Sequence, residues 1–186
     1  MTDGMISDLV GSTKELAEKI IKGTGDVTMS MTDAISDTVV KAMQGAGDVT
    51  TTATKTIGEV VSGAFSGVME AGGDAMTATT DVVDGVIKGV AKVSGDTVMA
   101  AHDVVHATVK GAGGAGADVA QVALAAVKGS IHATEEVGGD VAGVTKSAIE
   151  GAVAGASEIS EDAVKAVKDV LVTGVDGAKD IIDAIK

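Results

Sequence analysis

The chain has 186 residues, a formal net charge of −13 and a sequence pI of about 4.4, so its field repels phosphate backbones and nucleic acid is not an expected partner. It lacks Cys, Pro, Trp and Tyr, which excludes disulfides and cysteine metal sites, and Phe65 is its single aromatic residue. With 45% hydrophobic but 1% aromatic residues, any core consists of small side chains that each bury little area, so stability must come from many repeated contacts.

A repeat of 22 residues marks the predicted elements in chain order. Aspartates recur at this interval from Asp26 to Asp162, with one longer step of 26 residues between Asp48 and Asp74. They divide the chain into a single array of units at about residues 3–24, 25–46, 47–72, 73–94, 95–116, 117–138, 139–160 and 161–182. Since two stretches of eleven residues make about six helical turns, each column of the repeat stays on one face of a helix.

Each predicted helix carries an apolar row, defined as the residues nine and thirteen positions after its Asp. In chain order the row consists of Ile35 and Val39, Ile57 and Val61, Val83 and Ile87, Val105 and Val109, Val127 and Ile131, Ile149 and Val153, and Leu171 and Val175, with Ala17 in the first unit. The apolar columns within a unit are mostly three or four residues apart, which is the period of a helix and not of a strand. We therefore expect an all-helical fold whose helices pack through this row.

A second column, fifteen residues after each Asp, holds small residues in most units. It reads Lys19, Lys41, Gly63, Gly89, Gly111, Ala133, Gly155 and Gly177, and four residues earlier stand Gly85, Ala107, Gly129 and Gly151. Small residues four apart allow two helix backbones to touch. Because Gly costs about 1 kcal/mol against Ala in a helix, its recurrence indicates a compensating contact. This small face predicts that each helix packs on two sides.

Gly followed by Asp separates most units, and it ends one helix and begins the next because Gly favours helix C-termini and Asp favours N-caps. The predicted N-caps are Asp26, Asp48, Asp74, Asp96, Asp118, Asp140 and Asp162, and the last junction, which lacks Gly, also offers Ser160 as a cap. The expected product is a bundle or solenoid of antiparallel helices of ~18 residues joined by tight turns. Since no proline forces a break, long continuous helices with an eleven-residue period are the alternative.

One pair of residues resembles part of a metal site. His102 and His106 lie four residues apart on one helix face, a spacing that can bind Zn²⁺. Asp103 stands where a zinc protease has its catalytic Glu, no third ligand is evident, and other units place Thr, Lys, Ser or Gly in these columns. We therefore interpret the two histidines as a solvated pair, and expect no cofactor and no enzymatic activity.

The runs Gly85–Val93 and Val172–Val175 combine Val, Gly, Ala, Thr and Lys in an eleven-residue period. In this the chain resembles the lipid-binding repeats of synucleins, and its 22-residue unit is similar to that of exchangeable apolipoproteins. The resemblance implies amphipathic helices on a lipid surface. The Thr-rich stretch between Thr24 and Thr80 also resembles long helical antifreeze proteins, which implies ice binding.

The function expected first is structural. Helices that cannot bury their own Val/Ile and Gly/Ala faces stack on neighbours, so the chain itself is the expected partner, in a filament, tube or sheet. The alternatives are a coat on a lipid surface or granule, an ice-binding protein, and a passive binding scaffold. We find no signal-peptide pattern, and charges interrupt each apolar stretch before the ~20 residues that a membrane helix needs. A cytoplasmic location is therefore expected, with an extracellular one left open.

Overall fold

The computed structural model describes residues 2–22, 30–44, 49–72 and 74–185, and these residues form helices without any strand. The expected all-helical class is confirmed. The helices of this part of the chain are α1 (Thr2–Lys22), α2 (Met31–Gln44), α3 (Val49–Glu70), α4 (Ala75–Lys92), α5 (Thr97–Ala115), α6 (Val119–Val137), α7 (Val141–Ser157), α8 (Glu161–Gly174) and α9 (Ala178–Ala184).

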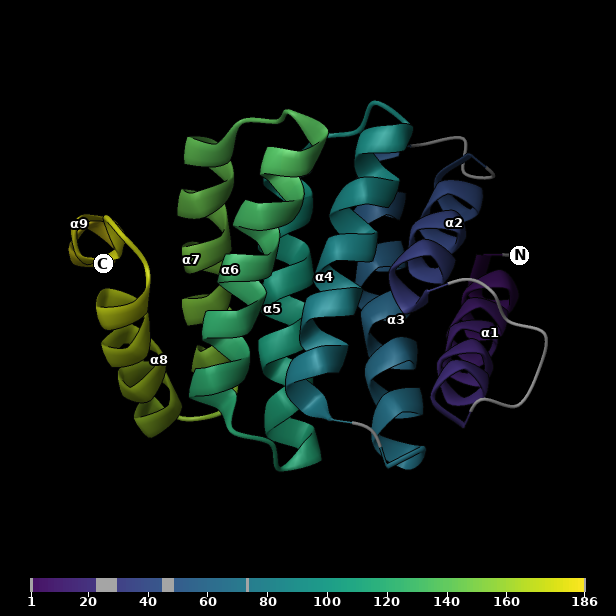
Figure 1. Ribbon diagram of the computed structural model, residues 1–186, viewed down its shortest axis with the longest axis horizontal. Helices are drawn as coiled ribbons and strands as arrows, with labels where there is room; N and C mark the ends of the chain where they lie inside the picture. The colour runs from purple at the N-terminus through teal and green to yellow at the C-terminus, as the bar shows by residue number, and fades with distance from the viewer. Residues whose placement is uncertain (1, 23–29, 45–48, 73, 186) are drawn as a thin grey trace.

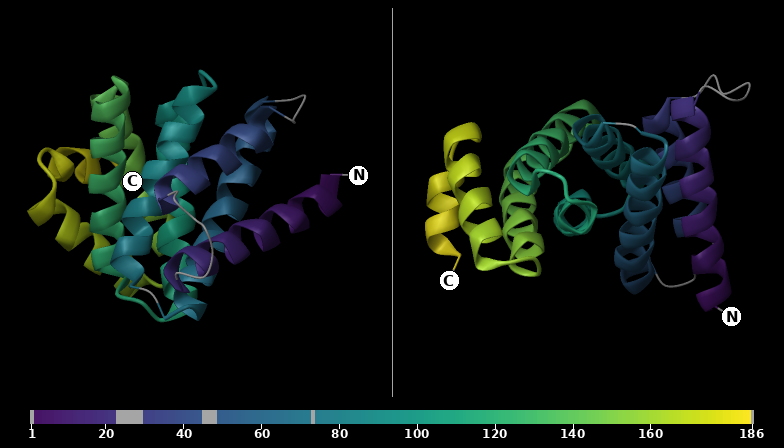
Figure 2. Two further views of the ribbon diagram at one scale, coloured as in Figure 1. Left: turned by 45° about the vertical axis from the view of Figure 1, so that its right-hand side comes forward. Right: turned by 90° about the horizontal axis from the view of Figure 1, so that it is seen from below.

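The helices form two layers because each packs most closely on the helix two places away in the chain. One layer contains α1, α3, α5 and α7, and the other contains α2, α4, α6 and α8. In Figure 1, α2, α4 and α6 lie in front of α3 and α5, and the two ends of the chain lie at opposite ends of the array. The helix axes turn along the array, so α1 and α2 are inclined to α4 and α6 (Figure 2).

Asp side chains begin four of the helices. The carboxylate of Asp74 accepts hydrogen bonds from the backbone N–H groups of Met76 and Thr77. Asp96 caps α5 in the same way, and Asp118 and Asp140 cap α6 and α7 by accepting one N–H each, from Gln121 and Gly143. Asp26 and Asp48 lie outside the described residues. Because a helix ends at each junction between residues 74 and 185, the alternative of long continuous helices does not hold for that part of the chain.

The last unit differs from the prediction in two ways. Ser160, and not Asp162, is the N-cap of α8: its Oγ accepts the N–H of Ala163, while Asp162 lies in the first turn, where the helix dipole favours a negative charge. The unit also breaks into two helices, because the chain leaves the helix after Gly174. Gly177 has a φ of 77° and precedes the short α9, so it is a turn residue and not a helix-packing contact.

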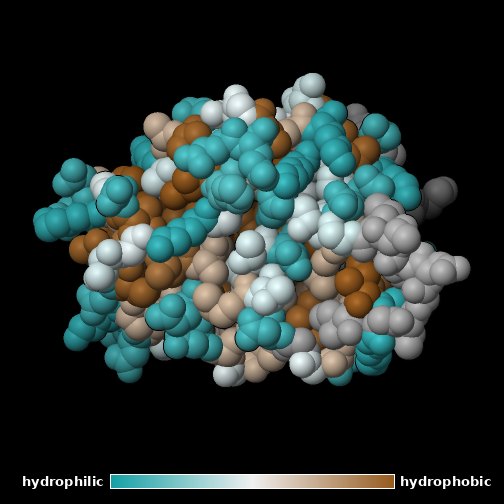
Figure 3. Space-filling model, in the orientation of Figure 1, coloured by the Kyte–Doolittle hydropathy of each residue, from teal (hydrophilic) through white to brown (hydrophobic). Residues whose placement is uncertain are grey.

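The apolar row forms the core between the layers. All of its predicted members are buried except Ile131, which is partly buried at the edge. The break after Gly174 explains this exception, since the residue that would cover Ile131 is the turn glycine Gly177. On the face shown in Figure 3, hydrophilic residues cover much of the upper part, and hydrophobic residues gather most densely on the left, toward α8.

Candidate functional site: a groove between α3 and α5

Helices two places apart meet through the small face of the later helix and the apolar row of the earlier one. A Cβ atom built on Gly89 of α4 would stand 2.9 Å from both the carbonyl oxygen of Ser36 and the Cβ of Val39. A Cβ on Gly155 of α7 would stand 2.6 Å from the carbonyl oxygen of His106. Since only glycine permits such close backbone approach, these small-face residues are packing surfaces inside the chain.

Gly85 and Gly151 make the matching contacts one turn earlier. Gly85 lies against Thr32 and Ile35 of α2, and Gly151 lies against the backbone of His102 in α5. Gly129 of α6 meets Val83 of α4 more loosely, at 3.6 Å.

The small face of α3 is displaced by one turn. In α3, Gly63 and Gly67 lie against the carbonyl oxygens of Val10 and Lys14 in α1, so Gly63 makes the contact that Gly85 makes in α4. The 26-residue step between Asp48 and Asp74 explains the shift, because its four extra residues add about one turn. Phe65, and not Val61, therefore stands at the later place of the apolar row in α3.

Three of these interfaces also contain a salt bridge, which lies beyond the later residue of the small face, and we call this salt bridge a clasp. Three residues after the later small-face residue stands a Glu that pairs with a Lys of the earlier helix. The clasps are Lys14–Glu70 between α1 and α3 at 2.7 Å, Lys88–Glu136 between α4 and α6 at 2.7 Å, and Lys110–Glu158 between α5 and the residue after α7 at 2.6 Å. Hydrogen bonds from Lys110 and His106 hold the pKa of the Glu158 carboxyl below its usual value.

The interface between α3 and α5 lacks both the close contact at a small-face glycine and the clasp. Its small face is Ala107 and Gly111, yet a Cβ on Gly111 would meet nothing within 4 Å. Gly111 is therefore not the helix contact that the sequence predicted. The clasp is missing too, because Gly114 replaces the Glu on α5, and Ser66 replaces the Lys on α3.

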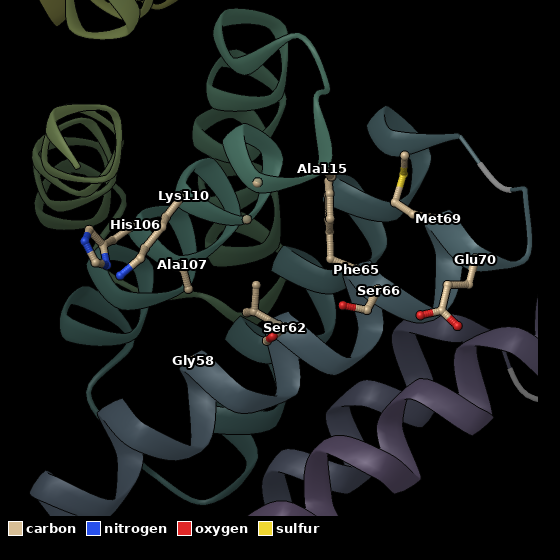
Figure 4. Close-up of a pocket in the computed structure, with 13 residues that line it drawn as sticks. Gly58, Ser62, Phe65, Ser66, Met69, Glu70, His106, Ala107, Lys110 and Ala115 are labelled. Carbon is tan, nitrogen blue, oxygen red and sulfur yellow. The ribbon is translucent and has the colours of Figure 1, made fainter. Parts of the chain in front are cut away.

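A groove of about 690 Å³ opens along this interface. Its walls are Gly58, Val61, Ser62, Phe65, Ser66, Met69 and Glu70 from α3, and His106, Ala107, Lys110, Gly111, Gly114 and Ala115 from α5. Figure 4 shows the Phe65 side chain reaching toward Ala115, with His106 and Lys110 on the α5 side and Glu70 turned toward α1. Because Glu158 pairs with Lys110 and His106, and Lys14 pairs with Glu70, the rim charges are already neutralised within the chain.

One member of the predicted histidine pair, His106, lines this groove. The rings of His102 and His106 stack with centroids 6.1 Å apart and an interplanar angle of 9°. His106 Nε2 lies 2.6 Å from Glu158 Oε1, and His102 Nδ1 lies 3.2 Å from Asp103 Oδ1, a hydrogen bond that raises the pKa of His102. Among the described residues, no group of three or more His, Cys, Asp or Glu side chains is arranged to hold a metal ion.

The structure also explains why two lysines occur in the small-face column. Lys19 of α1 and Lys41 of α2 occupy the column where later helices carry Gly or Ala, and both are exposed. Among the described helices, none packs on these two from the side on which α1 packs on α3 and α2 on α4, and the column is exposed at this end. The sequence showed this difference but not its cause.

No protein-family model matches the chain, and no curated protein matches it. Within the described residues, none of the helices combines the length and the apolar character that crossing a membrane requires.

Proposed function

We propose that the protein is a non-enzymatic docking scaffold whose groove between α3 and α5 takes an amphipathic helix of a partner protein. The observation that carries the proposal is the unused packing surface of α5. Gly111 costs about 1 kcal/mol relative to Ala in a helix interior. Close contact with an earlier helix compensates this cost at Gly89 and Gly155, whereas the space above Gly111 is open. A partner that packs there supplies the contact that the array itself does not make.

The shape of the groove favours a helix over a compact small molecule. Its α3 wall runs from Gly58 to Glu70, which at ~1.5 Å per residue is about 18 Å. A long trough with apolar walls suits the row of anchors on an amphipathic helix. Phe65 offers a broad apolar surface, and the flexible side chain of Met69 can adapt to the occupant.

The charge of the chain indicates the character of the partner. The rim charges are paired internally, so the groove itself attracts through its apolar walls. Around it, the net charge of −13 steers a partner with a basic polar face toward the scaffold and repels an acidic one.

Self-assembly stays a prediction. The Val/Ile row and much of the Gly/Ala face are buried between helices of this same chain, so contacts between copies must use other surfaces. Coating of a lipid surface and ice binding also stay predictions, and no contact or cavity of the described residues favours them over docking.

The experiment compares two glycine replacements that differ only in location. Gly111→Leu fills the groove, and Gly11→Leu adds the same side chain on the exposed surface of α1, where a Cβ also meets nothing within 4 Å. The probe is a fluorescein-labelled designed peptide of about four helical turns with Leu on one face and Lys on the other. A peptide with Glu in place of Lys is the charge control.

We expect fluorescence anisotropy to give equal affinity for the native protein and Gly11→Leu, and an affinity at least about tenfold weaker for Gly111→Leu, which corresponds to about 1.4 kcal/mol. The Glu peptide should bind more weakly than the Lys peptide to all three. Equal binding of the Lys peptide to Gly111→Leu and Gly11→Leu, or its failure to bind the native protein, would contradict docking in the groove.

A further inference from the structure

The spacing between helices two places apart depends on the two residues of the small face. Where both residues are Gly, the two helices touch. In α4, a Cβ on Gly85 would stand 2.7 Å from the carbonyl oxygen of Thr32, and in α7 Gly151 lies against the carbonyl oxygen of His102. The two small-face glycines of α3 lie against α1 in the same way.

An Ala in the small face accompanies a wider spacing. In α6 the small face is Gly129 and Ala133, and a Cβ on Gly129 would stand 3.6 Å from the nearest atom, a methyl carbon of Val83. In α5 the small face is Ala107 and Gly111, and a Cβ on Gly111 would meet nothing within 4 Å. Both of these α5 residues are partly exposed, whereas the small-face residues of α3, α4, α6 and α7 are buried.

The α2–α4 interface shows that the missing clasp does not by itself separate two helices. This interface has no clasp either, and it contains only the exposed pair Lys92–Asp37 at 3.9 Å. The helices nevertheless touch. Both interfaces have Gly at the later position of the small face, and they differ at the earlier position, which is Gly85 in α4 and Ala107 in α5.

Helix α5 meets α3 in the register in which α4 meets α2. One turn before the small face, the Thr32 hydroxyl of α2 donates a hydrogen bond of 3.5 Å to Asp81 of α4. The matching residues are Thr54 of α3 and Asp103 of α5. Burial raises the pKa of the Asp103 carboxyl, but hydrogen bonds from His102 and Thr54 outweigh burial and lower it. The one-turn shift of α3 therefore concerns its contact with α1, and its contact with α5 keeps the spacing of the unit.

In this register, the Cβ of Ala107 faces the backbone of α3 at Thr54, as a Cβ on Gly85 would face the backbone of α2 at Thr32. A Cβ held 2.7 Å from a carbonyl oxygen would overlap it, so α5 cannot approach α3 as closely as α4 approaches α2. Because no clasp draws the helices together beyond this point, the space continues past Gly111.

We propose that Ala107 is a spacer that holds the groove open, because its methyl group keeps α5 off the backbone of α3. This inference rests on the proposed function, in which the groove is the docking site, and it names the residue that sets the width of that site. Ala107 is a positioning residue, and glycine in its place lets α5 close onto α3 as α4 closes onto α2.

The test measures the spacing across the interface. The chain has no Cys, so two introduced cysteines, Glu15→Cys on α1 and Ala142→Cys on α7, carry spin labels without background. Both positions are exposed and outside the groove, and the labels follow α3 and α5 because α1 packs closely on α3 and α7 on α5. Pulsed electron resonance then gives the label distance in the native background and in three variants.

The variants separate the loss of the methyl group from other effects of substitution. Ala107→Gly removes the Cβ, and Ala107→Ser keeps it. Ala125→Gly carries the same loss of helix propensity at a partly buried position of α6 outside the groove.

We expect Ala107→Gly to shorten the mean label distance by more than about 1 Å, which is the difference between the open space above Gly111 and the 2.9 Å contact at Gly89. It should also weaken binding of the Lys peptide about tenfold. Ala107→Ser and Ala125→Gly should resemble the native protein in both measurements.

Three outcomes overturn the spacer: an unchanged label distance in Ala107→Gly, an equal shortening in Ala107→Ser, or less helicity by circular dichroism in Ala107→Gly than in Ala125→Gly. The last would contradict closure because closure adds contacts between α3 and α5.

The two proposals fail in different measurements. If the labels approach in Ala107→Gly but Gly111→Leu binds the Lys peptide like the native protein, docking is wrong and the spacer stands. If the labels do not move but Gly111→Leu abolishes binding, the groove is a docking site and its opening has another cause, which overturns the spacer alone.

Discussion

Two glycines at the same place in the repeat should respond oppositely to the same substitution. Gly111→Ala adds a methyl group in open space, so only the helix propensity changes, and stability should rise by about 1 kcal/mol. Gly155→Ala gains the same propensity, but its Cβ would stand 2.6 Å from the carbonyl oxygen of His106 and 3.1 Å from the Cβ of Val109. Because backbone atoms must then move, overpacking costs roughly 1–3 kcal/mol.

The two variants should therefore differ in free energy of unfolding by about that overpacking cost, roughly 1–3 kcal/mol. Urea unfolding followed by far-ultraviolet circular dichroism is the suitable assay, since the chain has no Trp or Tyr for fluorescence. Whole curves should be compared, because helical arrays can unfold in stages. Gly11→Ala on the exposed surface of α1 is the control and should match Gly111→Ala. Equal stabilisation by Gly155→Ala would refute the view that the small face packs on the earlier helix.

Three further predictions concern single contacts. Ile149→Ala removes a fully buried member of the apolar row and should lower the free energy of unfolding by about 2–5 kcal/mol in urea melts, whereas Ile149→Val should cost about 0.5–1.5. Asp96→Ala removes the N-cap of α5 and should cost about 1 kcal/mol by thermal melting, while Asp96→Asn, which keeps an acceptor oxygen, should cost less. The hydrogen bond to Asp103 raises the folded-state pKa of His102 above its ordinary 6.5, so its stabilising contribution is complete below that pH and is lost as the pH rises through the folded-state pKa. As the pH rises through the neutral range, the urea midpoint of unfolding should fall more in the native protein than in His102→Gln. Equal slopes of midpoint against pH would contradict this assignment.

The helices and most of their caps could be predicted because they depend on local chemistry. The carboxylates of Asp74 and Asp96 accept backbone N–H groups two and three residues away, so a single unit of sequence contains all the information. The period of Ile149 and Val153 likewise identifies a buried face from one helix alone. Ser160 is the N-cap at the one junction without glycine, where the side chains of Ser160 and Asp162 are both possible acceptors.

The groove could not be predicted because it depends on which helices meet. Periodicity shows that Val39 and Gly89 lie on packing faces, but it does not show that α4 packs more closely on α2 than on α3. Without that pairing, the sequence alone gives no reason for the lysines at positions 19 and 41 in a column of small residues. The 26-residue step was visible, and applying it as a one-turn shift to α3 would have matched Gly67, and not Gly63, with Gly89 of α4.

An array in which most helices pack more closely on the second neighbour than on the first has a consequence for how such a chain can change in length. Inserting or deleting one helix would exchange the two layers for everything downstream and bring mismatched surfaces together. Inserting or deleting a consecutive pair leaves each remaining helix in its own layer, with a partner of the same kind. Growth by duplication is therefore restricted to steps of about forty-four residues, two units at a time.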